Sequence, residues 1–196
     1  MKNAIFVMLE DYADWEYGYL ASQLNKSVAW NVKTCSTTKL VASIGGFETR
    51  VNYLIDELAE PCDLLVLIGG NSWKIKNEPL KKFIATHLAA NKPTAAICGA
   101  VDYLAENGLL LHYKHTGNAQ YLWHDFKEYT NQTEFIPVQA VHDRNLVTAN
   151  GTAALEFTNL VLKMIHFLPN SEADKATDLY KLGFYKYCDK YGNPFA

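Results

Sequence analysis

The stretch Pro93-Thr-Ala-Ala-Ile-Cys-Gly-Ala-Val-Asp102 joins a short apolar segment to a helical one and decides the fold. Thr94 to Ile97 are small or apolar, which predicts a strand covered on both faces. A helical pattern starts at Ala100, so Cys98 and Gly99 occupy a sharp strand-to-helix turn. At such a nucleophile elbow, the N–H groups and the dipole of the following helix favour a thiolate. The stretch therefore predicts a reactive Cys98, with a small buried hydrophobe as the alternative.

Outward from this turn, apolar strands alternate with helical patterns along the chain. Strands are predicted at 4–9, 28–34, 63–68, 94–97 and 109–116, with hairpins at 41–50 and 140–149. Helices are predicted at 15–24, 78–90, 100–106, 118–126, 153–168 and 173–191. This alternation indicates an α/β fold with a mostly parallel sheet and helices on both faces. Ligands bind such sheets at the C-terminal ends of the strands, where loops 10–16, 69–73, 98–99 and 150–152 meet.

Composition and charge exclude several classes of function. The 196 residues suit one domain, and a formal net charge of −3 gives no basis for a nucleic-acid partner or an anionic membrane surface. No apolar run could span a bilayer, and Glu10 and Asp11 come too early for a signal peptide, so we expect a cytoplasmic protein. The cysteines Cys35, Cys62, Cys98 and Cys188 lie far apart, which predicts neither a zinc site nor disulfides. With no phosphate-binding loop, we expect no metal and no cofactor.

Four motifs occur in an order that carries a resemblance to a known family. They are Ala13-Asp-Trp-Glu16, Gly69-Gly70, Ala96-Ile-Cys-Gly-Ala100 and Thr148-Ala-Asn-Gly-Thr152. Together they resemble the ThiJ/PfpI family of the class I glutamine amidotransferase-like superfamily. The resemblance covers roughly residues 3–168 of one domain, with residues 173–191 as a C-terminal helical extension. It implies a flavodoxin-like three-layer α/β/α sandwich.

The resemblance also implies roles for residues at the turn. Cys98 matches the family nucleophile and Glu16 the carboxyl group beside it. This pairing works physically if the pKa of Glu16 is raised, because a protonated carboxyl can donate a hydrogen bond to a thiolate. The alternative for Glu16 is a first-turn glutamate favoured by the helix dipole. Gly70 and Gly99 would supply oxyanion-binding N–H groups, and tight-turn geometry alone also accounts for both.

The third catalytic group departs from the family pattern. PfpI-type members place a histidine directly after the cysteine, where this chain has Gly99. Deglycase-type members place one after the strand that follows the elbow helix, a position that falls here on Gly117 or Asn118. His115 is near but shifted, and a shift of one residue along a strand turns a side chain to the other face. His115 and Asn118 both remain candidates for lining the site.

Two further residues are candidate site-lining groups. Asp14, two residues before Glu16, resembles an acidic residue of the isocyanide hydratase branch, although a helix N-cap is the favoured interpretation. Trp73 follows the Gly69-Gly70 pair and could cover the cysteine, although aromatic residues are more often part of the core.

The sequence thus predicts a ThiJ/PfpI-type hydrolase or lyase that hydrolyses or hydrates a small electrophilic molecule through Cys98, without a cofactor. The alternatives are a cysteine-based oxidative-stress sensor or a glutamine amidotransferase-like protein without turnover, because an exposed low-pKa thiolate oxidises readily. A third is an oligomeric scaffold with a vestigial site. We expect a homodimer, since many members of the family are dimers and the C-terminal helix is rich in aromatic residues.

Overall fold

A central sheet organises the computed structural model, which describes residues 1–58 and 61–196. Within these residues the sheet has seven strands in the order β5-β2-β1-β6-β7-β9-β8. Their bounds are β1 (Lys2–Val7), β2 (Trp30–Ser36), β5 (Tyr53–Leu54), β6 (Leu64–Leu67), β7 (Thr94–Ile97), β8 (Ala140–Asp143) and β9 (Leu146–Ala149). All neighbours pair in parallel except β8 and β9, which form an antiparallel hairpin at one edge. The predicted mostly parallel sheet is confirmed.

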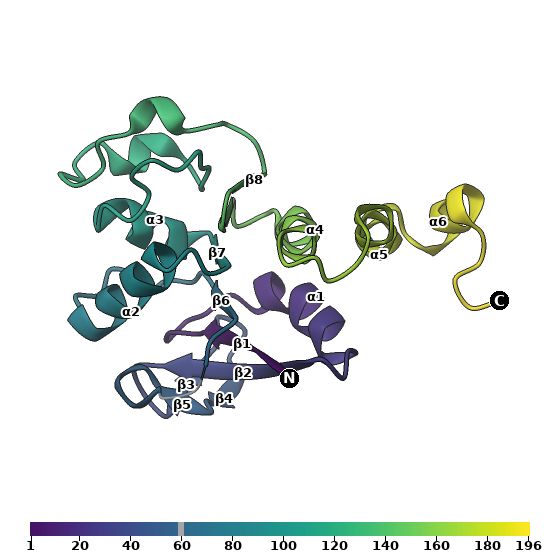
Figure 1. The fold of residues 1–196 in the computed structure, drawn as a ribbon, viewed down its shortest axis with the longest axis horizontal. Helices are drawn as coiled ribbons and strands as arrows, with labels where there is room; N and C mark the ends of the chain where they lie inside the picture. The colour runs from purple at the N-terminus through teal and green to yellow at the C-terminus, as the bar shows by residue number, and fades with distance from the viewer. Residues whose placement is uncertain (59–60) are drawn as a thin grey trace.

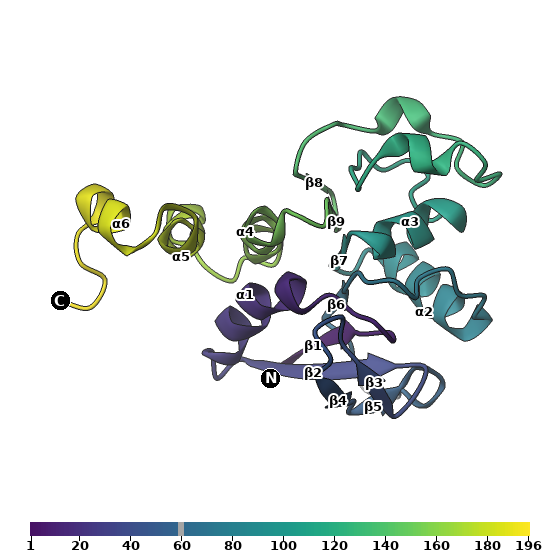
Figure 2. The same cartoon turned by 180° about the vertical axis from the view of Figure 1, so that it is seen from behind.

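Helices cover both faces of the sheet, as Figures 1 and 2 show from opposite sides. The helices are α1 (Asp14–Asn25), α2 (Glu78–Ala89), α3 (Gly99–Glu106), α4 (Ala154–Met164), α5 (Asn170–Leu182) and α6 (Phe184–Tyr191). α1 and α4 lie on one face and α2 and α3 on the other, while α5 and α6 follow one another outward from α4 (Figure 1). The smaller elements are β3 (Leu40–Ala42), β4 (Glu48–Arg50), η1 (Ile55–Glu57), η2 (Gln120–Trp123) and η3 (Gln132–Glu134).

The core consists of two apolar layers, one on each side of the sheet. Side chains alternate along a strand, so neighbouring residues of β1 face opposite layers. Phe6 packs on the side of α1 and α4, and Ile5 on the side of α2 and α3. Both side chains are almost fully buried, and each such burial contributes about 1.5–3 kcal/mol. This two-sided burial is why the strands read as continuous apolar runs.

The segment after α3 differs from the prediction. Residues 109–116 form turns instead of a strand, and His115 pairs with Phe135 only through an isolated bridge. The predicted helix at 118–126 is reduced to η2. Side-chain hydrogen bonds replace a regular ladder here: the Asn131 amide donates to the Leu110 carbonyl oxygen at 2.8 Å. Among the described residues, the apolar run at 109–116 has no neighbouring strand to pair with. It therefore folds as an irregular segment that covers α3.

The C-terminal extension also departs from the single predicted helix at 173–191. Gly183 separates α5 from α6 with φ +77° and ψ 162°, a conformation that favours glycine. α5 packs on α4 through Ala173, which is fully buried, and Thr177, which is nearly so. Across residues 1–58 and 61–196, no helix combines the length and the apolar character needed to cross a membrane.

Candidate active site

Cys98 is the single residue between the last residue of β7 and the first residue of α3. Its backbone has φ 59° and ψ −130°, and its N–H donates to the Ala149 carbonyl oxygen at 3.0 Å. A non-glycine residue held in such a conformation costs about 1–3 kcal/mol, which the surrounding structure must offset. The sheet and helix therefore fix the Cys98 side chain at the C-terminal edge of the strands, where the sequence predicted it.

Glu16 is the buried acidic partner of Cys98. Its side chain is 0% exposed, its Oε2 accepts the Gly69 N–H at 2.7 Å, and it hydrogen-bonds with Cys98. Burial raises the pKa of Glu16 to about 7, although the bonds from Gly69 and Cys98 act in the opposite direction. Among the described residues, no group donates to Oε1, the second oxygen. An unpaired buried oxygen is costly as part of a carboxylate and can carry a proton instead.

The thiol of Cys98 responds to the same surroundings. Burial raises its pKa, and the charge of Glu16 raises it further. Hydrogen bonds from the Asn118 amide and from the Gly99 N–H lower it. Because burial disfavours two adjacent negative charges, the pair of Glu16 and Cys98 retains one proton after the first is lost. The arrangement can move that proton from sulfur to carboxylate and back.

Asn118 completes the contacts of the sulfur. Its Nδ2 donates to Cys98 Sγ at 3.3 Å, while its Oδ1 accepts the Gly151 N–H at 2.9 Å. The Asn150 amide donates to the Asn118 carbonyl oxygen at 3.2 Å and so holds the backbone. Asn118 is exposed, so the donor that contacts the sulfur is also open to solvent.

The loop after β9 approaches the sulfur from another side. A Cβ atom at Gly151 would lie 2.8 Å from Cys98 Sγ, so only glycine permits this approach. The indole N–H of Trp15 donates to the Gly151 carbonyl oxygen at 2.9 Å, with the side chain 51% exposed. Sequence reasoning placed this loop at the site but missed the contact with Trp15. The sequence pattern does not indicate which way the side chain of Trp15 points in the first turn of α1.

His115 lies in an aromatic cluster instead of at the sulfur. Its side chain is fully buried, Nδ1 pairs with the Tyr113 carbonyl oxygen and Nε2 with the Tyr129 hydroxyl, both at 2.8 Å. The rings of Trp123 and Phe135 pack against it. Burial lowers the pKa of His115, which favours the neutral ring. Of the two candidates, the structure brings Asn118 and not His115 to Cys98.

The two glycines predicted to bind an oxyanion approach the turn differently. The Gly99 N–H donates to the Cys98 sulfur. Gly70 comes close through its carbonyl oxygen, which would lie 2.7 Å from a Cβ atom placed on Gly99. Gly69, beside it, is equally confined, because its Cβ would lie 2.5 Å from that of Cys98. A Cβ atom on Gly70 would itself collide with the Asp11 carbonyl oxygen, so close packing excludes side chains at all three positions.

Trp73 lies in the core behind the turn that carries Cys98. Trp73 is 3% exposed, donates its indole N–H to the Ile68 carbonyl oxygen at 2.7 Å, and packs on Tyr103. It supports the turn from the core and faces little solvent.

The predicted N-cap role of Asp14 is wrong, because the N-cap is Ala13 and Asp14 is the first helical residue. Asp14 accepts the Gly45 N–H at 2.8 Å, tying α1 to the β3–β4 hairpin. Hydrogen bonds from Ser43 and Gly45 lower its pKa.

The other buried cysteines have a different environment. Burial raises the pKa of Cys35 and of Cys62 to about 12, so both remain thiols. In the part of the chain that the structure describes, no group of histidine, cysteine and acidic residues is arranged to hold a metal ion.

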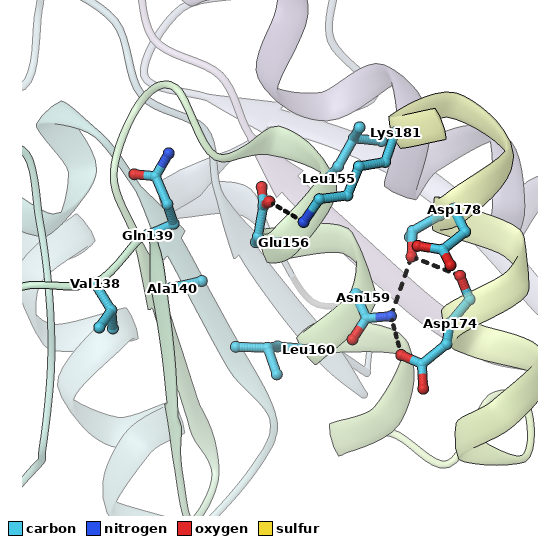
Figure 3. A pocket seen from close by; sticks show the side chains of 11 residues that line it. Val138, Gln139, Ala140, Leu155, Glu156, Asn159, Leu160, Asp174, Asp178 and Lys181 are labelled. Carbon is cyan, nitrogen blue, oxygen red and sulfur yellow. Dashed lines mark hydrogen bonds and ion pairs between the residues drawn. The ribbon is translucent and has the colours of Figure 1, made fainter. Parts of the chain in front are cut away.

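Two pockets adjoin the segment that leads into β8. One, of about 360 Å³, is lined by Asn118. The other, of about 380 Å³, lies between this segment, α4 and α5 (Figure 3). In Figure 3, Lys181 of α5 reaches Glu156 of α4, forming an ion pair at 2.8 Å. The first pocket includes Asn118, whose amide contacts Cys98, whereas the second faces the C-terminal extension.

Known proteins are similar to this chain in sequence and in fold. The sequence profile of the DJ-1/PfpI family matches residues 2–164. The "Uncharacterized protease YdeA" of Bacillus subtilis (strain 168) is 53% identical over 195 residues, covering 100% of this chain and 99% of the relative. The "Uncharacterized protease YoaZ" of the same organism is 36% identical over 182 residues, with 87% of each chain covered.

Solved structures agree with this comparison. A ThiJ/PfpI family protein from Bacillus anthracis superposes with a TM-score of 0.89 and 32% identity, covering 96% of this chain and 94% of the other. The DJ-1 superfamily protein Atu0886 from Agrobacterium tumefaciens gives a TM-score of 0.84 and 26% identity, covering 93% and 98%. The predicted family resemblance is confirmed.

Proposed function

Because the chain belongs to the DJ-1/PfpI family, we propose that it is a hydrolase that attacks a small acyl substrate with Cys98. The observation that carries this proposal is the contact of a strained, half-buried cysteine with a buried carboxyl group whose pKa is raised to about 7. Such a pair can exchange a proton at neutral pH, as covalent catalysis by a thiol requires. Both Bacillus subtilis relatives are named proteases, which favours cleavage of an amide over hydration.

Acylation begins when the Glu16 carboxylate accepts the thiol proton and the Cys98 sulfur bonds to the substrate carbonyl carbon. The electron pair of the C=O bond moves to oxygen, beside the amide of Asn118 and the N–H of Gly99, and this charge is stabilised by such donors. As the C–N bond breaks, Glu16 protonates the leaving amine and a thioester remains on Cys98.

Hydrolysis of the thioester reverses the roles. Glu16 accepts a proton from water as the water oxygen bonds to the thioester carbon, and then returns this proton to the departing sulfur. The sum is an amide and a water converted to an acid and an amine, with Cys98 and Glu16 restored. No histidine is needed, which agrees with the position of His115 in the aromatic cluster.

The test uses p-nitrophenyl acetate as an acyl probe. We expect the protein to release nitrophenolate and to carry a transient acetyl group on Cys98 detectable by mass spectrometry. Cys98→Ala should abolish both signals, whereas Cys188→Ala, which removes a half-buried cysteine on α6, should preserve them. Release of nitrophenolate by Cys98→Ala at the rate of the unmodified protein would exclude the proposal.

A further inference from the structure

The pocket beside Asn118 has a distinctive lining. It lies between residues 116–120 and residues 135–139, and Asn150 closes one side. Asn118 belongs to the pocket and also contacts Cys98 Sγ, so one side chain links a molecule in the pocket to the sulfur. A volume of about 360 Å³ falls in the range of small-molecule sites.

No charged side chain is found among the described residues that line this pocket. Its polar groups are the hydroxyl of Thr116 and the carboxamides of Asn118, Gln120, Gln139 and Asn150. The pocket in Figure 3 shares Val138 and Gln139 with it, yet also contains Glu156, Asp174, Asp178 and Lys181. An ionised ligand group in the uncharged pocket would lose hydration without gaining a counter-charge.

Most of the hydrogen-bond donors of these carboxamides are already used within the protein. The amide nitrogen of Gln120 donates to the Tyr129 hydroxyl at 3.1 Å and to the Gln132 carbonyl oxygen at 2.7 Å. That of Gln139 donates to the Thr152 hydroxyl at 3.3 Å. No donor among the described residues binds the side-chain oxygens of Gln120 and Gln139. Two residues that line the pocket therefore carry unused hydrogen-bond acceptors, the side-chain oxygens of Gln120 and Gln139.

Uncharged amide oxygens bind N–H donors, and a lining without a carboxylate disfavours a cationic donor, which would lose hydration there without a counter-charge. The apolar wall of Phe135, Pro137 and Val138 would pack against the uncharged remainder of the ligand. Resting on the proposed function of Cys98, we propose that this pocket is a substrate subsite for a neutral carboxamide group. It would hold this group against Asn118, the residue whose amide contacts the sulfur.

Alkylation of Cys98 tests the subsite without knowledge of the substrate. Iodoacetamide carries a neutral carboxamide with N–H donors, iodoacetate carries a charge, and N,N-dimethyl-2-iodoacetamide is neutral but has no N–H group. Rates at Cys98 are measured by peptide mass spectrometry and divided by those of N-acetylcysteine with the same reagent. Ratios between reagents cancel any change in the pKa of the thiol.

Substitutions at Gln139 should alter these ratios in opposite directions. Gln139 is exposed, so its variants should fold. Gln139→Glu should lower the ratio of iodoacetate to iodoacetamide roughly 3- to 10-fold, and Gln139→Lys should raise it by a similar factor. Gln139→Leu should reduce the preference for iodoacetamide over its dimethyl analogue about fivefold, the contribution of one net hydrogen bond.

Gln23→Glu, Gln23→Lys and Gln23→Leu are matched controls, because Gln23 lies in the last turn of α1, away from Cys98. If the Gln139 variants leave the ratios as unchanged as the Gln23 variants do, the subsite is excluded while the reactive cysteine stands. If neither neutral reagent alkylates Cys98 in the unmodified protein, the proposed function fails and the subsite fails with it.

Discussion

The side-chain amide of Asn118 donates a hydrogen bond to the sulfur of Cys98 across 3.3 Å. The same side chain accepts the Gly151 N–H, so its orientation is fixed with nitrogen towards the sulfur. The side chain that contacts the sulfur at this position is therefore a neutral amide. It can stabilise a thiolate but cannot accept the thiol proton, and in the proposed mechanism Glu16 accepts it.

Removing the Asn118 amide should make Cys98 less reactive. Asn118→Leu should raise the pKa of the thiol, because this amide lowers it by a hydrogen bond, and a hydrogen bond to a charged group contributes about 1.5–3 kcal/mol before screening by solvent. The pH dependence of Cys98 alkylation by iodoacetamide measures the effect. Asn159→Leu, at an amide that binds Asp174 and Thr177 on the far side of α4, is the control. An unchanged pH profile in Asn118→Leu would contradict the role assigned to this amide.

Glu16 should make the protein less stable as the pH rises. Its pKa is about 7 in the folded protein, against an ordinary value of 4.5 for a glutamate exposed to water. A raised folded pKa contributes stability that is complete below pH 4.5 and is lost as the pH rises to 7. The free energy of unfolding of the unmodified protein should therefore fall by roughly 3 kcal/mol across this window relative to Glu16→Gln.

Denaturant titrations at several pH values, with both proteins side by side, measure this difference. Glutamine keeps the acceptor for the Gly69 N–H, so contributions from other titrating groups cancel in the comparison. Parallel curves for the two proteins would show that Glu16 ionises as readily as an exposed glutamate.

Gly69 should tolerate no side chain, whereas Gly18 should. A Cβ atom at Gly69 would lie 2.5 Å from the Cβ of Cys98 and 2.6 Å from Glu16 Oε2, so Gly69→Ala must displace these two side chains. We expect a loss of about 1–3 kcal/mol of stability and of Cys98 reactivity. Gly18 lies within α1 with no atom within 4 Å of an added Cβ, so Gly18→Ala should gain about 0.5–1 kcal/mol. Thermal unfolding and iodoacetamide labelling of both variants provide the comparison, which fails if Gly69→Ala behaves like Gly18→Ala.

The backbone strain at Cys98 should be measurable by comparing two variants that both lack the thiol. Alanine retains the unfavourable φ of 59°, whereas glycine adopts it readily. Cys98→Gly should therefore be more stable than Cys98→Ala by about 1 kcal/mol, even though glycine is the more flexible residue when unfolded. Equal midpoints of urea unfolding would show that the turn holds no such strain.

Sequence patterns were sufficient for the layers of the fold and for the position of Cys98. The apolar run at Leu64–Leu67 and the small residues before Cys98 are buried on both faces, and such runs have few other structural solutions. The predicted strands and the order of four loop motifs also placed Glu16 and the 150–152 loop near one sheet edge.

What the sequence could not settle depended on the paths of irregular segments. His115 and Asn118 are three residues apart in a segment without regular structure, so no periodicity decides which one faces Cys98. The structure decides it through contacts with Tyr113 and Tyr129, which bury the His115 ring. Likewise, the break at Gly183 depends on a backbone conformation that a single glycine permits but does not require.

The strained turn at Cys98 also has an evolutionary consequence. A lineage that stopped using the thiol would gain stability from a glycine at this position, and random substitution would find it easily. A cysteine in this backbone conformation is therefore a residue that neutral drift should erase. Its presence at the edge of the sheet, next to a carboxyl group that is itself costly to bury, is what selection for a working site would leave behind.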